Sequence, residues 1–236
     1  MVLKSSARRR KDFGVLKIVV FDSGYGGEFF ADRLATELPV VEILRVINWR
    51  DADELLTSPH AARKIARDSL KPYIGRVDLI IFANYLLSLT SLKYFQRKFK
   101  NQKFLGLGLK TPDAFIKYDT LILSTKAVSR TINFHNYLFH LNRNIKILNL
   151  DTWPAKIDDG ELTVAEIQNT FELLLAGHPS FRPREIILAS SQFSDIKPGL
   201  KKIFGQSLKI YDGFDDTIRC ACKTLGIRGG VGKKLK

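Results

Sequence analysis

The chain has 236 residues, 45% of them hydrophobic, and its 38 Lys and Arg against 24 Asp and Glu give a formal net charge of +14 at pH 7. This length can bury a substantial core, in one domain or in two small ones. No apolar run approaches the roughly 20 residues of a membrane span, and the basic N-terminus precedes no apolar signal segment, so we expect a soluble cytoplasmic protein. The two cysteines, Cys220 and Cys222, have one residue between them on a predicted helix and imply no disulfide framework.

Much of the positive charge lies at the two ends, and residues 1–15 and 228–236 are predicted to be basic tails. An excess of Lys and Arg attracts polyanions through counterion release. The tails therefore either serve as solvated extensions that keep the protein soluble or contact a nucleic acid or an acidic protein.

Short β-branched runs alternate with segments of helical period from Leu16 onward, which is typical of a parallel α/β fold. Strands are predicted to begin at or near Leu16, Val41, Asp78, Lys103, Thr120, Lys146, Glu185 and Ser207. Helices are predicted over residues 26–38, 59–74, 88–99, 128–142 and 163–177, where apolar residues recur three and four apart. Thr163 and Glu166 form a plausible capping box at the start of the last of these.

The first strand and the turn after it, LKIVVFDSGYGGEFF over residues 16–30, have the pattern of a buried strand that leads into a binding turn. Asp22 and Ser23 would lie at the carboxyl end of the strand, and the glycines would let backbone approach a ligand. A simpler interpretation is that Asp22 only caps the following helix and that the glycines only serve the turn.

The segment D-S-G-x-G-G after a hydrophobic strand resembles the opening of glutamate racemase and its aspartate/glutamate racemase superfamily, and the resemblance runs in order from Leu16 to Ile227. It implies two similar α/β lobes with mainly parallel sheets that face each other across a cleft. Residues 16–109 plus 207–227 would form the first lobe and residues 110–206 the second, with the C-terminal segment returning to the first. It also implies chemistry that needs no cofactor and no metal.

The family's two catalytic cysteines are replaced in this chain. They act as opposed acid and base groups, in a C-N-T motif of one lobe and a G-C-T-H motif of the other. Here the first motif reads Ala83-Asn84-Tyr85, and the second has Ser190 at the cysteine and Gln192 at the histidine. Leu56, Thr57 and Ser58 stand where the family carries a P-Y-G element over the substrate.

Other positions of the resemblance keep their polar residues. Residues expected to bind a small acidic ligand such as glutamate or aspartate are Asp22, Ser23, Asn84, Thr125 and Ser191. Residues of these types at strand ends are also ordinary turn residues. His135 and His140 are five residues apart and share no helix face, so no metal site is predicted.

Three functions remain open from the sequence. The first is a glutamate-racemase-like protein without racemase activity, whose cleft binds a small acid. The second is an active racemase or isomerase of the same superfamily with altered acid and base residues, which would supply D-glutamate for peptidoglycan. The third is a basic regulatory module that binds nucleic acid or protein through its tails. Each is compatible with an oligomer.

Overall fold

The computed structural model describes residues 15–51, 59–108, 119–131, 134 and 145–227. Most of both predicted tails, the segment Leu56–Ser58 and most of the predicted helix over residues 128–142 lie outside these residues. All eight predicted strands are present, and every strand pairing described is parallel, which confirms the predicted α/β class.

The first sheet has the order β2-β1-β3-β4, and its central strand β1 pairs with β2 from Leu16↔Val41 to Asp22↔Ile47. Its elements are β1 (Leu16–Asp22), α1 (Tyr25–Glu37), β2 (Val41–Ile47), η1 (Trp49–Asp51), α3 (Pro59–Leu70), β3 (Leu79–Phe82), α4 (Tyr85–Lys98) and β4 (Phe104–Gly106).

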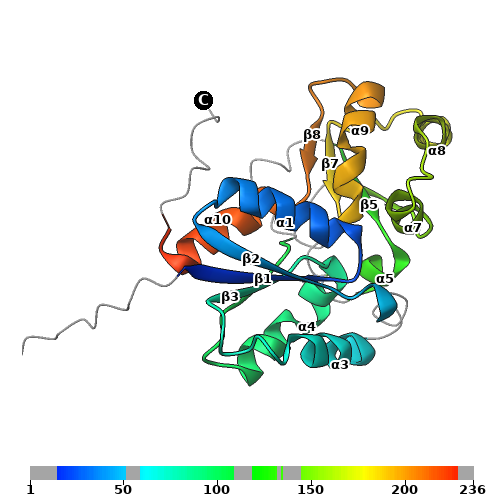
Figure 1. Ribbon diagram of the computed structural model, residues 1–236. Helices are drawn as coiled ribbons and strands as arrows, with labels where there is room; N and C mark the ends of the chain where they lie inside the picture. The colour runs from blue at the N-terminus through cyan, green and yellow to red at the C-terminus, as the bar shows by residue number, and fades with distance from the viewer. Residues whose placement is uncertain (1–14, 52–58, 109–118, 132–133, 135–144, 228–236) are drawn as a thin grey trace, which may run out of the picture.

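Alternate residues of β1 pack against different helices. Ile18 and Val20 belong to a core with α1 and α10 (Phe214–Leu225), whereas Val19 and Phe21 belong to a core with α3 and α4. Figure 1 shows α1 and α10 on one face of the first sheet and α3 and α4 on the other. Both faces of β1 are buried, which explains its uninterrupted apolar sequence.

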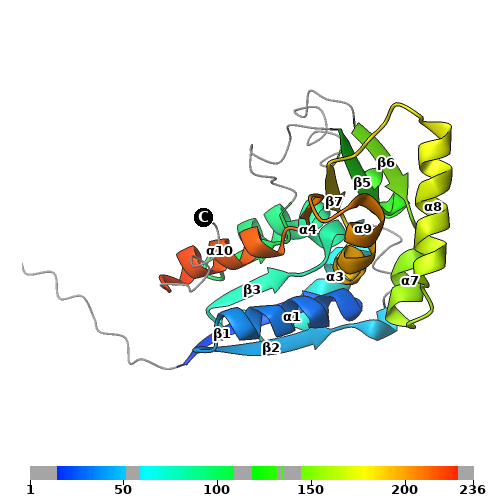
Figure 2. The same cartoon turned by 90° about the horizontal axis from the view of Figure 1, so that it is seen from above.

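The second sheet has the order β6-β5-β7-β8. Its elements are β5 (Thr120–Ser124), α5 (Lys126–Ser129), β6 (Ile145–Asn149), α7 (Trp153–Asp158), α8 (Val164–Gly177), β7 (Glu185–Leu188), η3 (Gln192–Ile196), α9 (Lys197–Phe204) and β8 (Lys209–Tyr211). Leu121 and Leu123 of β5 pack with α7, α8 and α9, which lie on the outer side of this sheet in Figures 1 and 2. Ile122 and Ile187 instead join the core that contains α1 and α10, so the two lobes share one apolar core.

The C-terminal segment returns to the first lobe later than predicted. β8 pairs with β7 in the second sheet, from Glu185↔Lys209 to Ile187↔Tyr211. The following helix α10 packs on the first lobe, where the rings of Phe30 and Phe214 lie 5.0 Å apart. The predicted boundary at residue 207 is therefore wrong by one strand, because the short run before Asp212 satisfies its backbone groups on the edge of β7.

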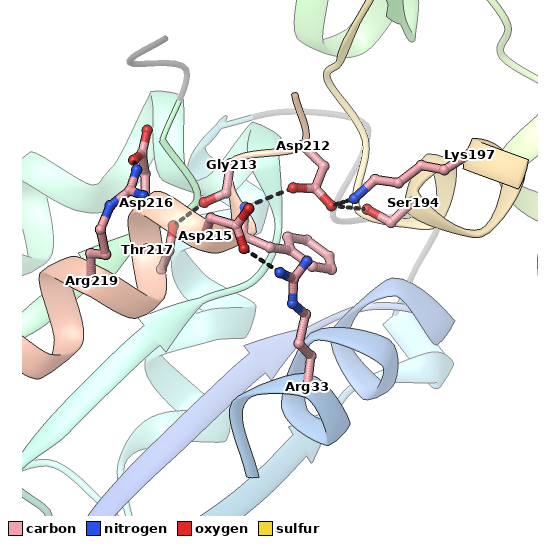
Figure 3. Close-up of polar contacts among 10 residues, drawn as sticks. Arg33, Ser194, Lys197, Asp212, Gly213, Asp215, Asp216, Thr217 and Arg219 are labelled. Carbon is pink, nitrogen blue, oxygen red and sulfur yellow. Dashed lines mark hydrogen bonds and ion pairs between the residues drawn. The ribbon is translucent and has the colours of Figure 1, made fainter. Parts of the chain in front are cut away.

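Asp212 stabilises the crossing between the lobes (Figure 3). Its carboxylate accepts hydrogen bonds from the backbone N–H of Phe214 at 3.0 Å and from Ser194 Oγ at 3.0 Å, and it forms an ion pair with Lys197. Its backbone carbonyl accepts a hydrogen bond of 2.5 Å from the hydroxyl of Tyr85 in the first lobe. The Asp212 side chain is only 5% exposed, so these contacts are made largely away from water.

We expect Asp212→Ala to lower the free energy of unfolding by about 2 to 4 kcal/mol, because it removes the acceptor of the Phe214 N–H at the start of α10 and leaves Lys197 without its partner. The measurement is urea unfolding followed by circular dichroism. Asp215→Ala is the matched control, since the ion pair of Asp215 with Arg33 is largely exposed and is worth at most about 1 kcal/mol. Equal losses for the two variants would contradict this role for Asp212.

Candidate functional site

The carboxylate of Asp22 joins the two lobes at the carboxyl ends of their sheets. Asp22 is fully buried, and its Oδ1 accepts hydrogen bonds from the backbone N–H of Ser23 at 2.7 Å and from Asn84 Nδ2 at 3.0 Å. Its Oδ2 accepts a hydrogen bond of 3.0 Å from Ser191 Oγ in the second lobe. The N-cap of α1 is Gly24 rather than Asp22, so the interpretation of Asp22 as only a helix cap is wrong.

The glycines of this turn allow the close approach of the second lobe. A Cβ atom at Gly26 would lie 2.3 Å from Ser191 Oγ, and one at Gly24 would lie 2.7 Å from Gln192 Nε2. Any larger residue at Gly26 would collide with Ser191, so this glycine is required for the contact between the lobes. The sequence suggested a close approach to a ligand; the structure shows a close approach to the other lobe.

A pocket of about 340 Å³ opens beside this contact and is lined by both lobes. Of the residues predicted to bind a ligand, Ser23, Asn84, Thr125 and Ser191 line it; Asp22 lies beneath it and contacts three of its neighbours rather than the pocket itself. Tyr85, Ser190, Gln192 and Asp158 also line it.

Two of the lining residues also organise the helices that follow them. Asn84 Oδ1 accepts a hydrogen bond of 3.0 Å from the N–H of Leu87 and caps α4. Thr125 Oγ1 accepts one of 3.4 Å from the N–H of Val128 and caps α5. Asn84 and Thr125 therefore act as local capping residues, in line with the interpretation of them as ordinary turn residues, and they also line the pocket.

The two positions where the resemblance predicts catalytic cysteines hold Ala83 and Ser190. Ala83, directly after β3, is fully buried. Ser190, two residues after the end of β7, donates a hydrogen bond of 2.8 Å to Gln192 Oε1. An amide oxygen is not a base, so this contact does not activate the serine hydroxyl.

Asp158, at the C-terminal end of α7, is a pocket residue that the sequence analysis did not identify. Burial raises its pKa to about 6, against hydrogen bonds from Gln192 and the backbone N–H of Tyr25 that favour the carboxylate. Its Oδ1 is buried and has no hydrogen-bond partner in the described part of the chain. A carboxylate at a helix C-terminus is unfavourable because it meets the negative end of the helix dipole. This unfavourable position of Asp158 was the one local signal in the sequence that could have indicated a functional role.

Asp22 is the second carboxyl group with a perturbed pKa. Burial raises the pKa of Asp22 to about 7, although hydrogen bonds from Asn84, Ser23 and Ser191 favour the carboxylate. The charge of Asp158 adds a smaller increase, which places the two carboxyl groups within electrostatic reach of each other.

The cysteines lie away from this site. Cys222 is buried on α10 within the shared core, Cys220 is exposed on the same helix, and neither lines the pocket. Among the residues that the structure describes, no cluster of His, Cys, Asp and Glu is arranged to hold a metal ion. No helix in the described ranges is long and apolar enough to cross a membrane.

The protein is therefore a two-lobed α/β protein, in which each lobe has a parallel sheet and a pocket lies between the carboxyl ends of the two sheets. No protein-family model and no curated protein matches this chain. Solved structures do match it, and they include glutamate racemases and an aspartate racemase.

Glutamate racemase from Campylobacter jejuni has a TM-score of 0.71 at 21% identity, over 94% of this chain and 89% of that one. The Escherichia coli enzyme, solved with L-glutamate and the activator UDP-MurNAc-Ala, has a TM-score of 0.75 at 16% identity, over 94% and 87%. Aspartate racemase from Picrophilus torridus has a TM-score of 0.58 at 17% identity, over 94% and 95%. The chain therefore has the fold of the glutamate and aspartate racemases, which confirms the predicted resemblance at the level of the fold.

We expect Asp22→Asn to remove a pH dependence of stability. Because the pKa of Asp22 rises from 3.8 when unfolded to about 7 when folded, the folded state holds a proton between these values that the unfolded state lacks. The stability of the wild type relative to the variant should therefore fall as the pH rises from about 4 to about 8, by up to about 4 kcal/mol. Urea unfolding across this range measures it.

The exposed Asp195→Asn is the control and should show no such trend. If the difference in the free energy of unfolding between wild type and Asp22→Asn stays constant with pH, the raised pKa of Asp22 is contradicted.

Proposed function

We propose that the protein binds a small amino acid such as glutamate or aspartate in the pocket between its lobes and does not racemise it. The observation that carries this proposal is the pocket's composition: hydroxyl and amide groups from both lobes line it together with one carboxylate that has an unused oxygen. Ala83 and Ser190, where the resemblance predicts cysteines, supply no pair of acid and base groups.

Asp158 is suited to the ammonium group of the ligand. Its Oδ1 is a buried acceptor without a donor in the described residues, and an ammonium group would supply both a hydrogen bond and a compensating charge. The other acid of the pocket, Asp151, already accepts a hydrogen bond of 2.7 Å from the N–H of Lys126.

The ligand's carboxylate would be bound by neutral donors. Ser23 and Thr125 supply hydroxyl groups at the ends of β1 and β5, and Gln192 supplies an amide. This arrangement suits a zwitterion, since the carboxylate meets dipoles on one side while the ammonium meets Asp158 on the other. The solved glutamate racemases that hold D-glutamate or L-glutamate support a ligand of this kind.

We expect the wild type to bind glutamate or aspartate and Asp158→Asn to bind it about tenfold or more weakly, because the variant loses a charged hydrogen bond. The difference should shrink as the pH falls through about 6, since protonation removes the charge of Asp158 in the wild type as well. Isothermal titration calorimetry between pH 5 and 8 measures both effects.

The matched control is Asp159→Asn, which removes a neighbouring acid that is exposed and does not line the pocket. Unchanged affinity in Asp158→Asn, or equal losses in the two variants, would exclude the proposed role of Asp158.

An isomerase with altered acid and base groups is the second candidate, and Asp158 is the observation that favours it. A carboxyl group with a pKa of about 6 that lines a pocket is a reasonable general base. Racemisation also requires a group on the opposite face of the ligand, and Asp22 is buried beneath the pocket with both oxygens hydrogen-bonded.

We expect the protein not to exchange the α-proton of D- or L-glutamate or aspartate in deuterated water. NMR measures the exchange, and an active glutamate racemase is the positive control. We expect none from the double variant Ala83→Cys/Ser190→Cys either, because residue 83 is fully buried and does not line the pocket. Exchange by the wild type that Asp158→Asn abolishes would instead establish the second candidate.

A further inference from the structure

The positive charge of the folded chain is concentrated in one segment. Residues 59–108 contain ten Lys and Arg and two Asp, a net charge of +8. The residues between the predicted tails but outside this segment, 16–58 and 109–227, have a net charge of −2. The tails are therefore not the only basic part of the protein, and this segment belongs to the first lobe.

The fold collects these charges on one face, formed by α3 and α4, which run side by side against the first sheet in Figures 1 and 2. Ala62, Ala66 and Phe95 of these helices point into the core. We define the basic face by the cations on their outer sides: Arg63, Lys64 and Arg67 of α3, and Lys93, Arg97 and Lys98 of α4.

The face is hollowed around Tyr94. A depression of about 560 Å³ is lined by Arg63, Lys93, Arg97 and Lys98 together with Leu89 and Thr90, and a second of about 220 Å³ by His60, Arg63, Lys64 and Arg67. Tyr94 and Arg63 contribute to both, so the two form one cationic surface. The backbone positions of the three cations of α3 span about 6 Å along its axis at 1.5 Å per residue.

Few of these charges are neutralised. Arg67 pairs with Asp68 at 3.1 Å, whereas Lys64, Lys93 and Arg97 have no acidic partner in the described part of the chain. The guanidinium of Arg63 and the ammonium of Lys98 lie 5.5 Å and 5.4 Å from the centre of the Tyr94 ring, which holds both cations in place. A hydrogen bond from Lys98 and the charges of Lys98, Arg67 and Arg63 lower the pKa of Tyr94, as expected in a positive potential.

We propose that the basic face formed by α3 and α4 binds the phosphate backbone of a nucleic acid without reading its sequence. Six cations, a hollow shape and the near absence of acids provide the contacts for successive phosphates. Tyr94 is already in contact with two cations and serves to position them rather than to stack on a base. This activity is separate from the pocket between the lobes.

The composition of the face favours a nucleic acid over other polyanions. Interfaces with acidic proteins need an apolar centre, and interfaces with membranes need exposed apolar anchors. The exposed large apolar side chains of the described residues include none from α3 or α4. Interfaces with nucleic acids are polar and strongly positive, as this face is.

The test is fluorescence anisotropy with the full chain and a labelled 20-nucleotide RNA or the corresponding DNA duplex, at several KCl concentrations. The test variant is Lys64→Glu/Lys93→Glu/Arg97→Glu, and the matched control is Arg130→Glu/Lys202→Glu/Lys223→Glu. All six residues are exposed, so both variants carry the same net charge and keep the same tails.

The test variant should bind at least about tenfold more weakly than wild type, with a slope of log K against log salt reduced by about 2 to 3, whereas the control should lose less than about threefold. Two probes of different sequence should bind wild type equally. Equal weakening in the two variants would overturn the proposal, as would failure of wild type to bind either probe, or binding only to anionic lipid vesicles.

Discussion

The buried carboxylate of Asp22 constrains how the two lobes meet. A carboxyl group with no exposure needs hydrogen bonds for both oxygens, and the first lobe supplies donors to only one of them. The other oxygen depends on Ser191 of the second lobe, which reaches it because Gly26 has no side chain in its path. The separation of the two sheets at their carboxyl ends is therefore set by one hydrogen-bonded group, and the pocket beside it takes its shape from that separation.

The shared apolar core makes the same arrangement rigid. Ile122 and Ile187 of the second sheet lie in one cluster with Ile18 and Val20 of the first, and Tyr85 crosses to the backbone of Asp212. Separating the lobes would expose this apolar surface to water and break the contacts of Asp22. A pocket held in this way is preformed, which favours a small ligand that enters beside the contact over one that needs the lobes to open widely.

The sequence was sufficient for the strands, because both faces of β1 are buried and leave an uninterrupted apolar run that needs no tertiary information. Features that depend on distant contacts were less accessible. The edge of β7 determines that β8 joins the second sheet, and Asp158 faces the pocket only because α7 packs on β5. The basic face was hidden for the same reason, since its two helices are separated in the chain by β3 and meet only in the folded protein.

Helix α4 connects the pocket with the basic face. It begins after Asn84, whose side chain caps the helix and lines the pocket, and it ends with Arg97 and Lys98 on the basic face. At 14 residues it is about 21 Å long, and cations at its C-terminus are favoured by the helix dipole. Phe95 fixes it to the sheet through ring contacts of 5.1 Å with Phe82 and 5.5 Å with Phe104. The fold thus holds one wall of the pocket and part of the basic face on a single helix that is fixed to the sheet, so the two surfaces keep a constant distance from each other.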